Sequence, residues 1–390
     1  MRYMTAGESH GPQLTAIVEG VPAGVKVSED ALNADMARRQ AGYGRGGRQA
    51  IERDRARVVS GVRFGKTIGT PVAFVVENRD WQNWTDRMAV YGSAPANLKR
   101  ETTPRPGHAD LVGSLKIDSD DCRNVLERAS ARETAARVAA AGVAREFLAE
   151  VGVEIYSYVT SIGRVTLPEE DPMAQAAEYT PLEIEMSETR CPDQRITESM
   201  KQEIDAAREA GESLGGTFRV VARGLLPGVG GYATASERLT SRLGAALFSI
   251  PAIKGVEFGL GFEAARRVGS KVHDPILLDR GNGFTRASNN AGGLEGGMTT
   301  GLPLIATCAM KPIPTLMTPL DTIDLDTLEP TQASKERSDV CAVPAAAVVA
   351  EAEVAFVLAD AYLEKFGHEN MTDIRQAIAS YKQRLKTSAR

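Results

Sequence analysis

The chain has 390 residues and a formal net charge of −5; 43% of its residues are hydrophobic and 25% are charged. These values are typical of folded globular proteins, so a chain that is disordered throughout is excluded. No stretch approaches the roughly eighteen apolar residues of a membrane span, and the first residues lack the apolar region of a signal peptide. We therefore expect a cytoplasmic protein with no membrane partner.

The four cysteines form no CxxC pair and no Cys/His cluster with the spacing of metal ligands; they stand at positions 122, 191, 308 and 341. This pattern indicates neither a disulfide framework nor a zinc site. We expect reduced, buried thiols and no bound metal.

Two of the four histidines lie in short loops that contain glycine or proline. His10 follows Ser9 in the segment GESHG, and His108 lies in the segment PGHAD. A histidine beside a hydroxyl or an acid in such a loop is suited to general acid–base catalysis. On the loops alone, ordinary turn histidines are an equally good interpretation.

Residues 38–57 form a basic segment, RRQAGYGRGGRQAIERDRAR, in an otherwise acidic protein, and it contains seven arginines. Guanidinium groups bind phosphates and carboxylates in a planar, bidentate manner, so the segment favours a small anionic ligand. The alternative is a surface that binds RNA or another polyanion. RNA-binding RGG segments repeat and contain aromatic residues, however, whereas this segment occurs once and aromatic residues make up 5% of the chain.

The pattern of apolar and β-branched residues predicts strands at residues 13–20, 71–78, 153–163, 216–224 and 303–310. These segments do not alternate regularly with helices, and no GxGxxG or complete P-loop motif is present. The chain is therefore expected to have an α+β fold. Residues 165–200 are acidic and interrupted by proline, which favours a surface excursion from a single domain that spans residues 1–390.

Two long helices are predicted, one over residues 131–150 and one from Pro344 to Gly367. Ser130 and Glu133 match the S-x-x-E capping box at the start of the first helix. Arg128 and Arg132 add positive charge to the helix end that is already positive, which costs stability. Their placement indicates an anionic ligand at this end.

Eight motifs together resemble the chorismate synthase family over most of the chain and in the family's order. They are GESHG, RRQAGYGRGGR, RPGHAD, ERASARETAARVA, AIKGVEFG, the glycine-rich NNAGGLEGGM, KPIPT and RSDVCAVPAA. The resemblance implies a β-α-β sandwich, with helices layered between antiparallel sheets, and a homotetramer. It also implies a lyase that eliminates phosphate from 5-enolpyruvylshikimate-3-phosphate in a 1,4-anti sense to give chorismate. That reaction requires reduced FMN without net redox change.

The resemblance also assigns roles to single residues. His10 protonates or stabilises the departing phosphate, with Ser9 assisting; His108 supplies or holds a proton near flavin N1, and Asp339 faces flavin N5. The substrate's phosphate and carboxylates are neutralised by Arg39, Arg45, Arg48 and Arg132. Contacts with FMN are expected from Arg128, Ala129, Ser130, Pro251, Ala252, Gly296, Lys311, Pro312, Ile313, Pro314, Thr315 and Arg337.

The chain departs from the family pattern at two positions. The family often has serine at the position of Ala129 and an amide residue at that of Pro251. Proline has no backbone N–H, so residue 251 is expected to contact FMN through its carbonyl or by packing.

Some relatives reduce their own flavin with NAD(P)H, but no additional nucleotide-binding motif is visible in this chain. We therefore expect a monofunctional enzyme that depends on an external flavin reductase or another supply of reduced flavin. A flavin oxidoreductase with net electron transfer is the alternative enzyme class.

Overall fold

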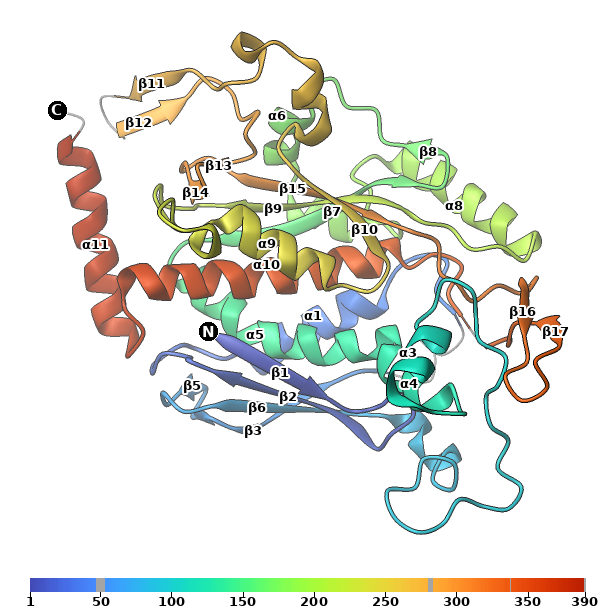
Figure 1. The fold of residues 1–390 in the computed structure, drawn as a ribbon. Coiled ribbons are helices and arrows are strands. Elements are labelled where there is room, and N and C mark those ends of the chain that lie inside the picture. Colours follow the sequence, from blue (N-terminus) through green and yellow to red (C-terminus); the bar gives the residue numbers. More distant parts are fainter. Residues whose placement is uncertain (47–52, 280–282, 337, 389–390) are drawn as a thin grey trace.

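A four-stranded antiparallel sheet forms from the N-terminal part of the chain (Figure 1). The structure is a computed structural model that describes residues 1–46, 53–279, 283–336 and 338–388. Along β2, the side chains of Leu14, Ala16 and Val18 are buried and alternate with more exposed residues, as expected for a sheet with one buried face. The strand order is β1 (Arg2–Ala6), β2 (Gln13–Glu19), β6 (Val72–Glu77) and β3 (Ala56–Ser60).

A second antiparallel sheet has five strands and includes the three later strands that the sequence predicts. Its central strands β9 and β7 are buried along most of their length, so this sheet is covered on both faces. The strand order is β10 (Ile253–Phe258), β15 (Leu304–Met310), β9 (Gly216–Arg223), β7 (Glu154–Ile162) and β8 (Val165–Thr166).

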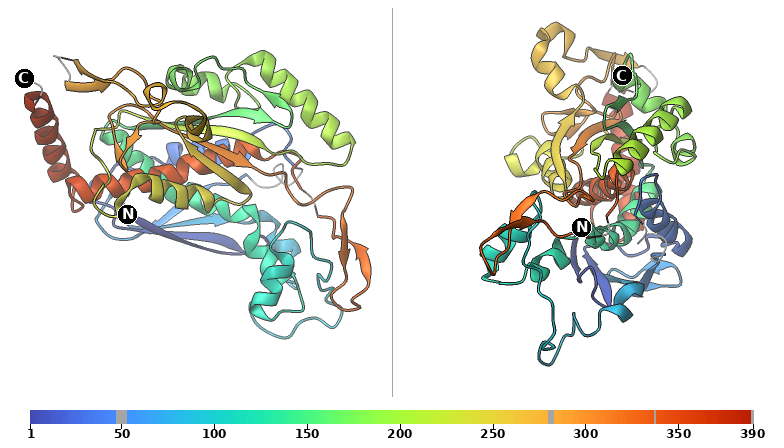
Figure 2. Two further views of the ribbon diagram at one scale, coloured as in Figure 1. Left: turned by 45° about the horizontal axis from the view of Figure 1, so that its top comes forward. Right: turned by 90° about the vertical axis from the view of Figure 1, so that its right-hand side faces the viewer.

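Four helices fill the space between the two sheets, and Figure 2 shows the same three layers from two further sides. They are α1 (Glu29–Gln40), α5 (Thr134–Glu150), α9 (Leu239–Phe248) and α10 (Val343–Phe366). Alanine is frequent in α5 and α10, which allows these two buried helices to pack closely. The layers confirm the expected β-α-β sandwich and the α+β fold class.

The remaining elements lie around this sandwich. The helices and turns are η1 (Arg79–Asn83), α3 (Asp110–Ile117), α4 (Arg123–Ala129), η2 (Ala131–Glu133), α6 (Pro172–Glu178), α7 (Pro181–Glu185), α8 (Gln194–Glu209), η3 (Ala235–Glu237), η4 (Gly261–Arg266), η5 (Gly269–Lys271) and α11 (Met371–Ser388). The short strands are β4 (Val62–Arg63), β5 (Lys66–Thr67), β11 (Ile276–Asp279), β12 (Gly283–Arg286), β13 (Leu294–Glu295), β14 (Met298–Thr299), β16 (Asp321–Ile323) and β17 (Pro330–Gln332).

The predicted helix ends are only partly correct. Pro344 lies in the first turn of α10, and Gly367 ends it with a φ of 101°, as the sequence indicates. The prediction of a capping box at the start of the other long helix, α5, is wrong. Ser130 caps the short turn η2 by accepting a hydrogen bond from the Arg132 backbone, and Glu133 instead pairs with Arg137.

Residues 165–200 were expected to form a surface excursion. They contain β8, α6, α7 and the start of α8, and parts of them pack against the larger sheet. Met173, Ile184, Cys191 and Met200 are buried in the hydrophobic core, while residues such as Leu182 and Met186 are exposed. The segment therefore covers one side of the core as well as forming surface.

Glu351 lies in the middle of α10 and is fully buried among arginines from other elements. Arg38 of α1 and Arg145 of α5 each lie 2.8 Å from its carboxylate, and Arg190 lies 3.2 Å away. Ser157 of β7 donates a hydrogen bond at 2.6 Å. One carboxylate thus joins two helices, a strand and a loop to α10.

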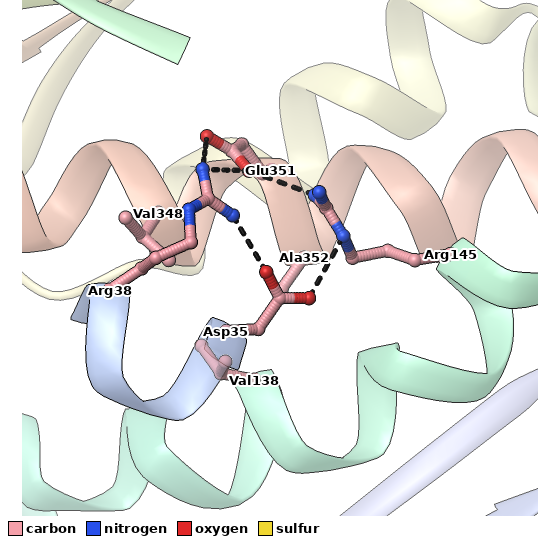
Figure 3. A pocket seen from close by; sticks show the side chains of 7 residues that line it. All are labelled: Asp35, Arg38, Val138, Arg145, Val348, Glu351 and Ala352. Carbon is pink, nitrogen blue, oxygen red and sulfur yellow. Dashed lines mark hydrogen bonds and ion pairs between the residues drawn. The ribbon is translucent and has the colours of Figure 1, made fainter. Parts of the chain in front are cut away.

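Asp35 completes this buried cluster, since its two oxygens contact Arg38 at 2.7 Å and Arg145 at 3.0 Å (Figure 3). Burial opposes ionisation of Glu351, but the surrounding arginines outweigh burial and lower its pKa to about 2. The carboxylate is therefore ionised wherever the protein is folded near neutral pH.

We expect Glu351→Gln to lower the free energy of unfolding by about 3–5 kcal/mol, because removing one partner leaves buried guanidinium charges without their counter-charge. Denaturant unfolding at neutral pH measures this loss. Glu263→Gln is the matched control: Glu263 also contacts two arginines but is exposed, so its substitution should leave the unfolding midpoint nearly unchanged.

The same cluster predicts a pH dependence. A carboxyl with a depressed pKa in the folded state stabilises the protein above its ordinary pKa of 4.5, and this contribution is lost as the pH falls towards 2. As the pH is lowered from 4.5 to 2, the free energy of unfolding should fall more steeply for the wild type than for Glu351→Gln. Equal slopes for both proteins would contradict the assignment.

Candidate active site

His10 lies in the loop between β1 and β2 and is held by Glu127 of α4. The backbone N–H of His10 donates to one carboxylate oxygen of Glu127 at 2.7 Å, and its ring Nδ1 lies 2.8 Å from the other. The backbone N–H of Ser9 donates to the Glu127 carbonyl at 2.9 Å. The two residues that the sequence singles out are thus attached to one turn of α4.

An indole ring covers the His10 imidazole. Trp84 stacks on it with ring centroids 3.9 Å apart and an interplanar angle of 26°. The Arg123 guanidinium lies over the same indole, and it also contacts Glu127 at 3.3 Å and Glu336 at 3.0 Å. Arg123 therefore connects the His10 loop to the segment that precedes α10.

His108 is paired with a carboxylate in a similar way. Its Nδ1 lies 2.5 Å from Asp110, which is completely buried at the start of α3. Arg105 donates to the same carboxylate through Nε at 2.8 Å and through its backbone N–H at 3.1 Å. Burial opposes ionisation of Asp110, but the hydrogen bonds from His108 and Arg105 hold its pKa well below the usual range. An ionised carboxylate only accepts hydrogen bonds, so Nδ1 of His108 is the donor.

Arg39 and Arg132 share a buried carboxylate, Asp54. Arg132 Nη1 lies 2.6 Å from Asp54, and Arg39 Nη1 lies 3.7 Å away. Arg132 also donates through Nε to the Asn78 side chain at 2.9 Å, and Asn78 in turn donates to the Gly11 carbonyl at 2.7 Å. The buried arginines are thereby fixed relative to the His10 loop.

Arg45 and Asp339 form a second ion pair next to this group. Arg45 Nη1 lies 3.0 Å from one Asp339 oxygen, and the Gly46 backbone N–H donates to the other at 2.6 Å. Within the described part of the chain, the buried Nε of Arg45 has no hydrogen-bond partner. The ion pair holds the segment that precedes α10 against the basic segment.

The electrostatics of this group favour an anion. Burial lowers the pKa of Arg39 to about 10; Asp54 opposes this, while the charges of Arg132 and Arg45 reinforce it. The group brings three guanidinium charges together with two carboxylates, so one positive charge is left without a counter-charge inside it. Arg39, Arg45 and Arg132, together with Asp54 and Asp339, thus form a site suited to phosphate or carboxylate groups. We refer to these five residues as the arginine cluster.

Several predicted cofactor residues come together near His108. The backbone N–H of Lys311 donates to the Ala252 carbonyl at 3.0 Å, and Lys311 Nζ donates to the Gly107 carbonyl at 2.5 Å. The Thr315 hydroxyl accepts from Arg105 at 3.0 Å. These hydrogen bonds join Ala252, residues 311–315 and the His108 loop to one another. Ala252 has a φ of 68°, a left-handed conformation that is uncommon for alanine.

Other predicted residues are placed differently. Arg128, Ala129 and Ser130 follow Glu127 at the end of α4, and Arg128 donates to the backbone carbonyls of Thr5 and Gly7. Gly296 lies in the turn between β13 and β14, which packs at the opposite end of β15 from Lys311. Arg48 and Arg337 lie outside the described residues.

The sequence interpretation did not assign roles to the acids that hold the histidines. Glu127 lies in the ERAS segment and Asp110 two residues after His108, so both stood within recognised motifs. The role of Asp110 could be detected from the sequence, because a histidine and an aspartate separated by one residue in a loop can interact directly. The role of Glu127 could not, because 117 positions separate it from His10. Trp84 and Arg105 were also missed.

Comparisons with known proteins identify the family. The model of the family described as chorismate synthase matches residues 1–363. The chorismate synthase of Aquifex aeolicus is 50% identical over 392 residues, covering 99% of this chain and 98% of that protein. The chain belongs to the chorismate synthase family. The chorismate synthase of Bacillus subtilis is 51% identical over 390 residues, with 97% of both chains covered.

A solved structure supports the same assignment at the level of the fold. The "Crystal Structure of Chorismate Synthase" superimposes with a TM-score of 0.80 at 43% identity, covering 99% of this chain and 98% of that one. The resemblance inferred from the eight motifs is confirmed, and the protein is a lyase, as members of this family are. No helix in the described residues is long and apolar enough to cross a membrane. Within the same residues, no cluster of His, Cys, Asp or Glu is arranged to hold a metal ion.

The arginine cluster predicts that inorganic phosphate raises the midpoint of thermal unfolding at constant ionic strength, because an anion bound to the folded state stabilises it. Arg45→Gln should weaken phosphate affinity about 10-fold, since one charge-assisted hydrogen bond is lost. Calorimetry and phosphate titration measure both effects. Arg195→Gln, which removes an exposed arginine, should leave the affinity unchanged; equal loss in both variants would show that phosphate acts only through net charge.

Proposed function

We propose that the protein converts 5-enolpyruvylshikimate-3-phosphate to chorismate by 1,4-anti elimination of phosphate, with reduced FMN bound and no net redox change. The observation that carries the proposal is the arginine cluster, which Asn78 connects to the loop of the carboxylate-paired His10; His108 is paired with a carboxylate in the same way. A substrate with one phosphate and two carboxylates needs concentrated positive charge, and an elimination needs groups that hold or move protons.

The cationic groups also fit a flavin phosphate. Residues 251–252 and 311–315 and the His108 loop, which are in mutual contact, are proposed to hold FMN together with Arg128, Ala129 and Ser130. When bound, reduced FMN supplies transient electron density to the elimination. The family motifs also propose Arg337 and Gly296 as contacts, although Gly296 lies at the opposite end of β15 from Lys311 and therefore apart from this group.

The chain's own residues are assigned as follows. His10 moves a proton to the departing phosphate from Nε2, since Nδ1 faces Glu127, and Ser9 assists. His108 holds a proton near flavin N1 with its Nδ1 fixed by Asp110. Asp339 is proposed to act near flavin N5, and the ion pair with Arg45 orients its carboxylate.

The remaining arginines orient the substrate. Arg39, Arg45 and Arg132 are proposed to bind its phosphate and carboxylates, together with Arg48. The first three are half-buried or buried and point to carboxylates inside the protein, which disfavours the alternative of an exposed RNA-binding surface. We further propose a cytoplasmic, single-domain homotetramer that receives reduced flavin from an external reductase.

An anaerobic assay of phosphate release with and without reduced FMN tests the reaction. Release should require reduced FMN and consume no reductant in proportion to product. NADPH with oxidised FMN should give no turnover without a reductase. Tight RNA binding that FMN does not affect, with no phosphate release, would instead support the polyanion-binding alternative.

The residue assignments predict that His10→Ala and His108→Ala each slow phosphate release by roughly two to four orders of magnitude, the usual contribution of a general acid or base. Asp339→Asn should still bind reduced FMN while its turnover falls. His368→Ala is the control, because this histidine is exposed near the end of α10. Near-normal rates in both histidine variants would overturn the proton roles.

A further inference from the structure

Glu127 makes two separate contacts with His10. One carboxylate oxygen accepts the backbone N–H of His10 at 2.7 Å, and the other lies 2.8 Å from the ring Nδ1. The same side chain therefore fixes both the main chain and the ring of one residue. Such a bidentate arrangement leaves the imidazole little rotational freedom about its side-chain bonds.

We propose that Glu127 is a positioning residue that fixes the tautomer and the orientation of His10, so that Nε2 is the nitrogen presented to the leaving phosphate. The inference rests on the proposed function, because it concerns the residue assigned to the departing phosphate. Glu127 itself does not touch the reacting atoms in this scheme. It acts through His10.

The ionisation of Glu127 supports the tautomer. Burial opposes the charge on this carboxylate, but the hydrogen bonds and charge of His10 and the charge of Arg123 outweigh burial, so the pKa of Glu127 lies below its ordinary value. An ionised carboxylate has no proton to donate, so the hydrogen between it and the ring belongs to Nδ1.

Trp84 supplies the second restraint. Its indole stacks on one face of the imidazole, while Glu127 holds the ring edge, so the two contacts restrict different motions. Trp84 is itself fixed, since its Nε1–H donates to Asp80 at 3.2 Å and Arg123 lies over its ring. Arg123 thus contacts both groups that hold His10.

Glu127→Gln tests the inference with little change in shape. The glutamine side chain can present either an oxygen or an NH₂ group to Nδ1, so it no longer selects one tautomer, and the negative charge is gone. We expect kcat for phosphate release to fall by roughly two orders of magnitude. KM and the affinity for reduced FMN should change less than about 3-fold, because the residue contacts neither ligand in the proposed site.

The double variant His10→Ala/Glu127→Gln gives the readout that a structural role would not produce. If Glu127 acts through His10, its substitution should cause no further loss once His10 is absent. Glu101→Gln is the matched control: Glu101 also approaches Arg123, at 3.6 Å, but has no contact with His10. It should retain the wild-type kcat.

The outcomes separate this inference from the proposed function. If His10→Ala releases phosphate slowly while Glu127→Gln releases it at the wild-type rate, the positioning role is overturned and the proposed function stands. A full additional loss in the double variant would also overturn it, because Glu127 would then act independently of His10. A normal rate in His10→Ala would overturn the role of His10 in the proposed function itself.

Discussion

The buried carboxylate of Glu351 is the interaction that holds together the helices around the candidate site. It ties α10 to α1 and α5 through Arg38 and Arg145. Burying several charges is expensive, and such a cluster is stable only when every partner is in place. It therefore selects one relative position of the three helices more sharply than apolar packing of alanine-rich surfaces does.

The ends of these same helices carry the arginine cluster. Arg39 directly follows Arg38 in α1, Arg132 lies in the turn that leads into α5, and Asp339 stands four residues before α10 begins. A shift of one helix along another would separate these groups. The ion cluster around Glu351 and the arginine cluster therefore both depend on the same packing of these helices.

Local sequence patterns predicted the strands and helix ends that depend on neighbouring residues alone. The five long strands follow from runs of apolar and β-branched residues, and the end of α10 follows from Gly367, which accommodates a positive φ. The first turn before α5 was predicted incorrectly, because Arg137 and not the Ser130 backbone attracts Glu133. The layered architecture came from the family motifs, since no local pattern states which face of an antiparallel sheet receives the helices.

In the candidate site, too, local patterns indicated some residues and missed the partners that are distant in sequence. Loop position and residue type indicated His10 and His108, and motif order indicated their neighbours. Partners distant in sequence were invisible: Asp54, which neutralises Arg132, is 78 positions away from it, and no single-sequence pattern connects them. The grouping of Arg39, Arg45 and Arg132 around two carboxylates likewise depends on the fold and not on any local pattern.

The stacking of Trp84 on His10 has a practical consequence. The chain contains two tryptophans, and one of them lies 3.9 Å, centroid to centroid, from the proposed proton donor. Indole fluorescence is quenched more strongly by a charged imidazole than by a neutral one. The emission of Trp84 is therefore a built-in optical reporter of the charge on the His10 ring, available in the native protein without a dye or a label.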